Sequence, residues 1–116
     1  MSGASKALGE WGERHAARWY EGRGYVVLAR NWRAPGHGGE LDLVVARQGT
    51  VVFCEVKTRS SAAFGIPAEA VTRTKQRRLR RLAAAWLGAD GRRWQTVRFD
   101  VAAVCGVAIT VVENAF

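Results

Sequence analysis

The sequence predicts an α/β fold in which helices flank one mixed sheet, with the element order α-β-β-β-α-β-β. Two observations carry this prediction: apolar residues recur at helical spacing in two segments, and five short apolar segments are separated by turn-forming residues. The chain has 116 residues, of which 48% are hydrophobic, enough to form a core without disulfides. We therefore expect residues 1–116 to form a single domain.

The first half of the chain predicts one helix and three strands. The helix is expected from Ser5 to Tyr20, and Gly22-Arg23-Gly24 ends it. Its apolar stripe consists of Leu8, Trp11, Gly12, His15, Ala16 and Trp19. Pro35 and three glycines indicate a loop over residues 31–39. The strands are expected over residues 25–29, 40–47 and 50–59, with the last two joined by a two-residue turn at Gln48-Gly49.

The second half predicts one helix and two strands. Pro67 suits the first turn of a helix that runs to about Leu87. The apolar stripe of this helix consists of Val71, Leu79, Leu82, Ala83, Trp86 and Leu87. After a turn over residues 89–93, strands are expected over residues 97–104 and 107–112.

The hairpin around Gln48-Gly49 brings charged residues together. With this turn setting the register, the numbers of facing residues sum to 97, so Asp42 faces Glu55 and Glu40 faces Lys57. All four share one face, because side chains alternate along a strand. The opposite face is apolar and carries Leu41, Leu43, Val45, Val52, Cys54 and Val56.

Two facing carboxylates repel each other, and partly buried charges need partners. A Mg²⁺ ion held by Asp42 and Glu55 would supply one, because Mg²⁺ takes oxygen ligands and is often shared with substrate phosphates. Lys57 would then orient a water or stabilise charge that develops during phosphodiester hydrolysis. The alternative is a solvated strand edge with a weak ion pair, worth about 0–1 kcal/mol.

The charge balance favours polyanionic partners. Eighteen Lys and Arg against ten Asp and Glu give a formal charge of +8, which draws a protein to nucleic acid first and to anionic membranes second. Basic residues crowd the front of the second helix: Arg73, Lys75, Arg77, Arg78, Arg80 and Arg81. They are expected either to bind backbone phosphates or to form a solvated helix face. Arg59 precedes Ser60 and Ser61, which we expect in a substrate loop.

Other features indicate structure rather than chemistry. Cys54 and Cys105 lie in apolar runs and are expected to be buried, reduced thiols. His15 is expected in the core, His37 in a loop, and Asp100 in a structural hydrogen bond. The N-terminus lacks the apolar core of a signal peptide, and the longest apolar stretch is too short to span a bilayer, so a cytoplasmic protein with no membrane partner is expected.

Several separated motifs occur together in this chain. They are Gly12-Glu13, Gly39-Glu40-Leu41-Asp42-Leu43, Phe53-Cys54-Glu55-Val56-Lys57-Thr58-Arg59, Lys75 and Arg98-Phe99-Asp100. With these motifs the chain resembles the bacterial YraN family of small endonuclease-like proteins over nearly its whole length. The resemblance implies a restriction-endonuclease-like fold with a PD-(D/E)-x-K active site, similar to archaeal Holliday junction resolvases.

Carried onto this chain, the resemblance makes Asp42 and Glu55 metal ligands, Lys57 the catalytic lysine, and Glu13 the acid on the helix that completes the site. Leu41 stands where the pattern has Pro. The resemblance implies a Mg²⁺- or Mn²⁺-dependent endonuclease that acts on DNA, with branched or otherwise non-standard structures among the candidate substrates. The alternative is a non-catalytic module that binds nucleic acid or a partner. Resolvase-like relatives commonly pair two subunits, which leaves a homodimer open.

Overall fold

The computed structural model describes residues 3–59 and 71–116. These residues form two helices, α1 (Gly3–Glu21) and α2 (Arg73–Asp90), and five strands. The strands are β1 (Val26–Trp32), β2 (Leu41–Arg47), β3 (Thr50–Arg59), β4 (Thr96–Cys105) and β5 (Ala108–Val112). The predicted order of helices and strands is confirmed.

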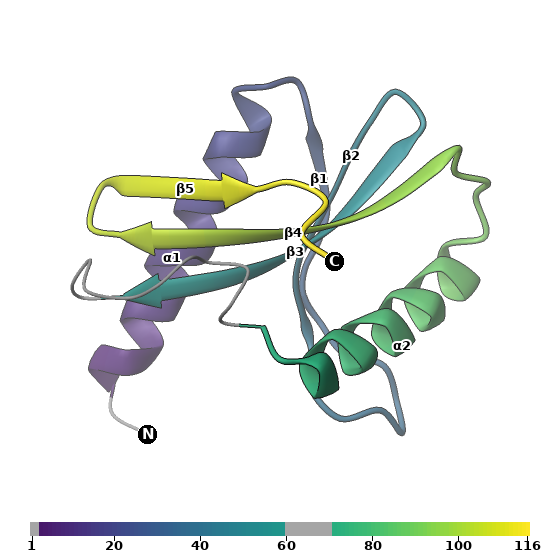
Figure 1. The fold of residues 1–116 in the computed structure, drawn as a ribbon, viewed down its shortest axis with the longest axis horizontal. Coiled ribbons are helices and arrows are strands. Elements are labelled where there is room, and N and C mark those ends of the chain that lie inside the picture. The colour runs from purple at the N-terminus through teal and green to yellow at the C-terminus, as the bar shows by residue number, and fades with distance from the viewer. Residues whose placement is uncertain (1–2, 60–70) are drawn as a thin grey trace.

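The five strands form one mixed sheet in the order β1-β2-β3-β4-β5. Only β3 and β4 pair in parallel, and α2 lies in the connection between them, as a parallel crossover requires. Neighbouring residues of β2 alternate between two apolar clusters: Val44 packs with residues of α2, whereas Val45 packs with residues of α1. The helices therefore cover opposite faces of the sheet (Figure 1).

The β2–β3 hairpin has the predicted turn and register. Gln48 and Gly49 both have positive φ, 48° and 79°, which a two-residue type I′ turn demands. The pairing runs from Arg47–Thr50 to Leu43–Cys54, and every pair sums to 97. Asp42 and Glu55 lie one step beyond the last of these pairs.

Leu41 differs from the prediction. It packs in the α2-side cluster with Val44 and Phe53, whereas Leu43 packs in the α1-side cluster with Val45. Residues two apart on a regular strand share a face. The chain therefore leaves strict alternation across Asp42, where the β2–β3 pairing no longer constrains it.

The buried face of α1 also differs from the predicted stripe. Its fully buried residues are Ala16, Ala17 and Tyr20, whereas Trp11 is 37% exposed and His15 is only half-buried beside it. The predicted stripe gave weight to the large apolar side chains. The helix instead turns its small residues to the sheet, which lets its backbone approach β3 closely.

The second helix starts later than predicted. Thr72 has extended backbone angles and caps α2, accepting a hydrogen bond from the Lys75 N–H, so the helix begins at Arg73. The expected helical turn at Pro67 lies outside the described residues. Gly91, in the left-handed conformation, ends the helix after Asp90.

Two further expectations concern β1 and Asp100. β1 extends to Trp32, so Asn31 and Trp32 belong to a strand rather than to the predicted loop. Asp100 is fully buried and accepts hydrogen bonds from the Tyr20 hydroxyl (2.6 Å) and the Arg98 guanidinium (2.9 Å), which confirms its structural role. Neither helix of the described residues is long and apolar enough to cross a membrane.

Candidate functional site

Asp42 and Glu55 meet at the end of the β2–β3 pairing. The Asp42 carboxylate accepts a hydrogen bond from the Val56 N–H (2.9 Å), so a side chain takes the place of a ladder carbonyl there. The Asp42 side chain also lies against Glu55, which is only 7% exposed. Burial, and then the nearby Glu55 carboxylate, raise the pKa of Asp42. The two facing acids are thus in direct contact, as the register predicted.

Glu13 reaches this pair from α1. Its neighbour Gly12 lies so close to β3 that an added Cβ would overlap the Thr58 side chain. This close approach lets Glu13 bring one carboxylate oxygen within 4.8 Å of an Asp42 oxygen. Burial raises the pKa of Glu13, and the negative charges of Glu40 and Glu55 act in the same direction.

Glu40, which the register predicted on the same face as Asp42 without a role as a ligand, joins the site together with Asn31. Oxygens of Glu13, Glu40 and Asp42 all lie within 4.8 Å of one another. Asn31, with its amide nitrogen turned to the acids, donates to Glu13 (2.8 Å) and to Glu40 (3.2 Å). Asn31 has a φ of 49°, a conformation that asparagine tolerates better than most residues. No sequence pattern assigned Asn31 to the site.

Two lysines face the acids from β3 and α2. The Lys75 ammonium lies 3.4 Å from a Glu55 oxygen, and the Lys57 side chain lies next to that of Lys75. Burial, followed by the contact with Lys75, lowers the pKa of Lys57. Burial also acts to lower the pKa of Lys75, but the contacts with Lys57 and Glu55 outweigh it and raise the pKa. Lys57 is therefore the member of the pair that loses its proton more readily.

These side chains surround an open pocket of about 390 Å³. Its lining combines Glu13 of α1, Asp42 of β2 and the β3 segment 55–59, which includes Arg59. The sequence-predicted acids and Lys57 are thus together in one place. Lys75 contacts the same site, whereas Arg73, Arg77 and Arg78 are exposed on α2 and are absent from this lining.

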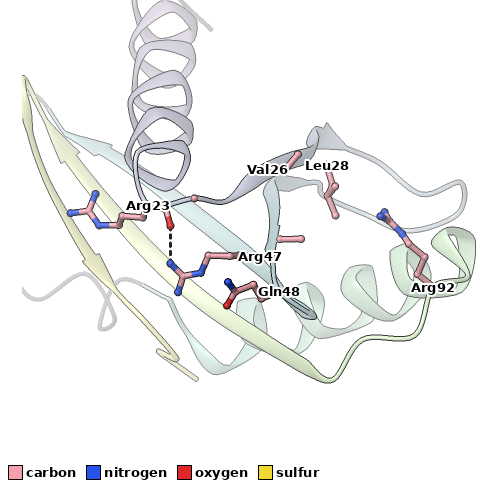
Figure 2. Close-up of a pocket in the computed structure, with 8 residues that line it drawn as sticks. Arg23, Val26, Leu28, Arg47, Gln48 and Arg92 are labelled. Atoms are coloured by element: carbon pink, nitrogen blue, oxygen red, sulfur yellow. Dashed lines mark hydrogen bonds between the residues drawn. The ribbon is translucent and has the colours of Figure 1, made fainter.

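A larger pocket, of about 640 Å³, lies at the hairpin end of the sheet (Figure 2). It is about five residues along β2 from Asp42, or roughly 17 Å. Its arginines already have partners: Arg47 donates to the Arg23 carbonyl (2.7 Å), and Arg92 pairs with Asp90 (2.6 Å). No carboxylate among the described residues lines it, so the candidate catalytic chemistry belongs to the smaller pocket.

Comparisons with known proteins agree on one family. The model of the uncharacterised protein family UPF0102 matches residues 12–104, a range that contains Glu13, Asp42, Glu55 and Lys57. A UPF0102 protein of Beutenbergia cavernae is 57% identical over 87% of this chain and 84% of its own. Those of Nocardia farcinica and Rhodococcus jostii are 50% and 51% identical, over 88% and 84% of this chain and 79% and 81% of theirs. The expected resemblance is confirmed, and the chain belongs to the uncharacterised, YraN-like protein family UPF0102.

Proposed function

We propose that this protein is a Mg²⁺-dependent nuclease that hydrolyses phosphodiester bonds in DNA, and that its α/β fold is restriction-endonuclease-like. The observation that supports this most strongly is the contact between Asp42 and Glu55 at a pocket that Glu13 and Lys57 also line. Acids and a lysine from three separate elements converge where both helices meet the sheet. So many adjacent like charges would destabilise a purely structural core.

The donor set fits a hard divalent cation. Every candidate ligand is a carboxylate oxygen, which Mg²⁺ and Mn²⁺ favour over the nitrogen and sulfur ligands of zinc sites. Burial first, and then the neighbouring negative charges, raise the pKa values of Asp42 and Glu13. Asp42, Glu55 and Glu13 would hold the ion, with Glu40 beside them. A bound ion would polarise a phosphoryl oxygen and acidify a water.

The chain's own basic residues complete the proposed chemistry. Lys57, with its lowered pKa, lies two residues beyond Glu55 and would orient the attacking water beside the scissile phosphate. Lys75, which forms an ion pair with Glu55, supplies positive charge for the phosphate that approaches the site. The formal charge of +8 supports a polyanionic substrate, and the resemblance to resolvases makes branched DNA the first structure to try.

The test is cleavage of duplex, nicked, flap and four-way DNA with Mg²⁺ or Mn²⁺. We expect metal-dependent cleavage of at least one substrate, reduced at least about 100-fold by Asp42→Asn and by Lys57→Gln. Asp90→Asn is a matched control, because it removes a carboxylate that pairs with Arg92 far from the pocket. Cleavage that all three variants retain equally would come from a contaminant and would refute the assignment.

One observation favours the alternative, a non-catalytic module that binds nucleic acid. Lys75 pairs with Glu55, and Asn31 donates to Glu13 and Glu40, so the chain itself partly compensates these acids. The alternative predicts salt-sensitive DNA binding, no heat of Mn²⁺ binding in calorimetry, and little effect of Lys57→Gln. Measurable Mn²⁺ binding that Asp42→Asn abolishes would exclude it.

A further inference from the structure

A third pocket lies next to the acidic cluster in the sequence. It has a volume of about 400 Å³ and lies between the β1–β2 loop and α2. Its lining consists of Gly36, His37, Gly38, Gly39, Arg78, Arg81 and Leu82. Gly39 directly precedes Glu40, so the pocket is one residue from the acidic cluster.

The two arginines of this pocket have no competing partner. Within residues 3–59 and 71–116, neither Arg78 nor Arg81 makes a hydrogen bond or an ion pair, whereas Arg98 and Arg92 are held by Asp100 and Asp90. Arg78 and Arg81 are exposed and three residues apart, so they lie on one side of α2. Their guanidinium groups remain available for an anionic ligand.

The loop backbone passes close to the Arg78 side chain. A Cβ added to Gly39 would lie 3.0 Å from Cδ of Arg78, and the φ of Gly39 is 82°. The absence of a side chain at this position therefore lets the arginine stem pass close to the loop. The loop and the stem of Arg78 therefore lie side by side at this pocket.

We propose that this pocket binds a phosphate of the DNA backbone, next to the Glu40 side of the acidic cluster. The inference rests on the proposed function and assigns residues that would bind the DNA substrate. A planar guanidinium matches phosphate oxygens bidentately, and glycines allow a backbone close to the loop. Lys75, Arg78 and Arg81 follow one another at about 4.5 Å rise along α2, so they form a basic track leading away from Glu55.

The other arginines of α2, which are Arg73, Arg77 and Arg80, do not line this pocket. Arg80 lies over the rings of Phe99 and Phe116, with its guanidinium carbon 5.0 and 5.5 Å from the ring centroids. Arg73 and Arg77 are exposed and line neither this pocket nor the acidic one. The pair Arg73 and Arg77 is therefore a matched control with the same helix and the same change of charge.

The experiment measures binding of a labelled four-way junction and a duplex in EDTA, where cleavage cannot interfere. We expect Arg78→Gln/Arg81→Gln to weaken binding at least tenfold and to reduce the slope of log K against log salt by about one unit, as loss of one phosphate contact requires. Arg73→Gln/Arg77→Gln should change affinity less than threefold. Equal losses in the two double variants would overturn the proposal. Circular dichroism and thermal melting verify that both fold.

A second arm identifies the source of the phosphate. Single neutral methylphosphonate linkages are placed along the probe, one position at a time. At one position the linkage should lower the affinity of the wild-type protein for the probe but not the affinity of Arg78→Gln/Arg81→Gln. If no linkage behaves in this way and inorganic phosphate alone shifts the Arg78 and Arg81 side-chain NMR signals, the pocket takes a small anion and the backbone assignment is wrong. Absence of wild-type cleavage, with the linkage effect intact, would refute only the proposed nuclease activity.

Discussion

Asp100 shows how one buried charge can hold several elements together. Its carboxylate accepts from Tyr20 of α1, from Arg98 of its own strand and from the Asn114 N–H after β5. Asp100→Asn keeps the volume but leaves the Arg98 guanidinium without its buried counter-charge. We expect a loss of about 3–5 kcal/mol in the free energy of unfolding, measured by urea denaturation. Glu113→Gln, which removes a half-exposed carboxylate 3.9 Å from the same Arg98, should cost less than about 1 kcal/mol.

Lys75 forms an ion pair with Glu55 in the metal-free protein and should therefore compete with a cation for this carboxylate. Lys75→Gln removes one positive charge 3.4 Å from a Glu55 oxygen. We expect the variant to bind Mn²⁺ about tenfold more tightly in isothermal titration calorimetry, because the ion no longer displaces an ammonium group. Arg77→Gln, an equal loss of charge on the outer face of α2, should leave the affinity unchanged. Weaker Mn²⁺ binding by Lys75→Gln would mean that Lys75 supports the site rather than competing for it.

At the scale of the element, the distance between α1 and β3 positions Glu13. Gly9 and Gly12 are one turn apart on this helix, but a Cβ meets nothing within 4 Å at Gly9 and would lie 1.8 Å from Oγ1 and 3.0 Å from Cβ of Thr58 at Gly12. Gly9→Ala should stabilise the protein by up to about 1 kcal/mol through helix propensity. Gly12→Ala should destabilise it by about 1–3 kcal/mol, because α1 must move away from the sheet.

Thermal or urea unfolding of the two glycine variants checks this, and opposite signs are expected. The same shift of α1 should carry Glu13 away from Asp42, so Gly12→Ala should also weaken Mn²⁺ binding in calorimetry while Gly9→Ala does not. If both variants gain stability, the helix does not depend on its close contact with β3.

The sequence predicted well those elements whose conformation is determined by a few neighbouring residues. The hairpin register could be predicted because Gln48-Gly49 suits a turn with two positive φ angles, and it placed Asp42 beside Glu55. The buried face of α1 was predicted only in part. Gly12 and Ala16 are buried as expected, whereas Trp11 is 37% exposed and Tyr20, outside the predicted stripe, is fully buried.

The remaining site residues come from places where sequence patterns say little. Glu40 and Asn31 lie at the two ends of the β1–β2 connection, and their side chains meet only because the loop folds back. The contact between Lys75 and Glu55 depends on how α2 packs across the sheet. The sequence placed Lys75 among the basic residues of the second helix but did not identify the acid that it meets.

At the scale of the whole molecule, the acids lie where α1, the β2–β3 ends and α2 converge, and the free arginines lie on the adjacent flank of α2. The negative site is thus small, within a chain of formal charge +8. Long-range attraction brings a polyanion to the surface, whereas the acids act only at short range. A divalent cation bound to the acids would offset the repulsion between the acidic pocket and an anionic substrate.

This arrangement should lower the stability of the metal-free protein. Asp42 and Glu55 repel each other when both are charged, and Asp42→Asn keeps an acceptor for the Val56 N–H while adding a donor to Glu55. We expect Asp42→Asn to increase the free energy of unfolding by about 1–2 kcal/mol in EDTA. Mg²⁺ at about 100 times its dissociation constant should stabilise the wild-type protein by about 2.7 kcal/mol and the variant hardly at all. Urea denaturation with and without Mg²⁺ measures both effects. A wild-type protein that Mg²⁺ does not stabilise, together with an Asp42→Asn variant that is less stable in EDTA, would mean that the pair is structural.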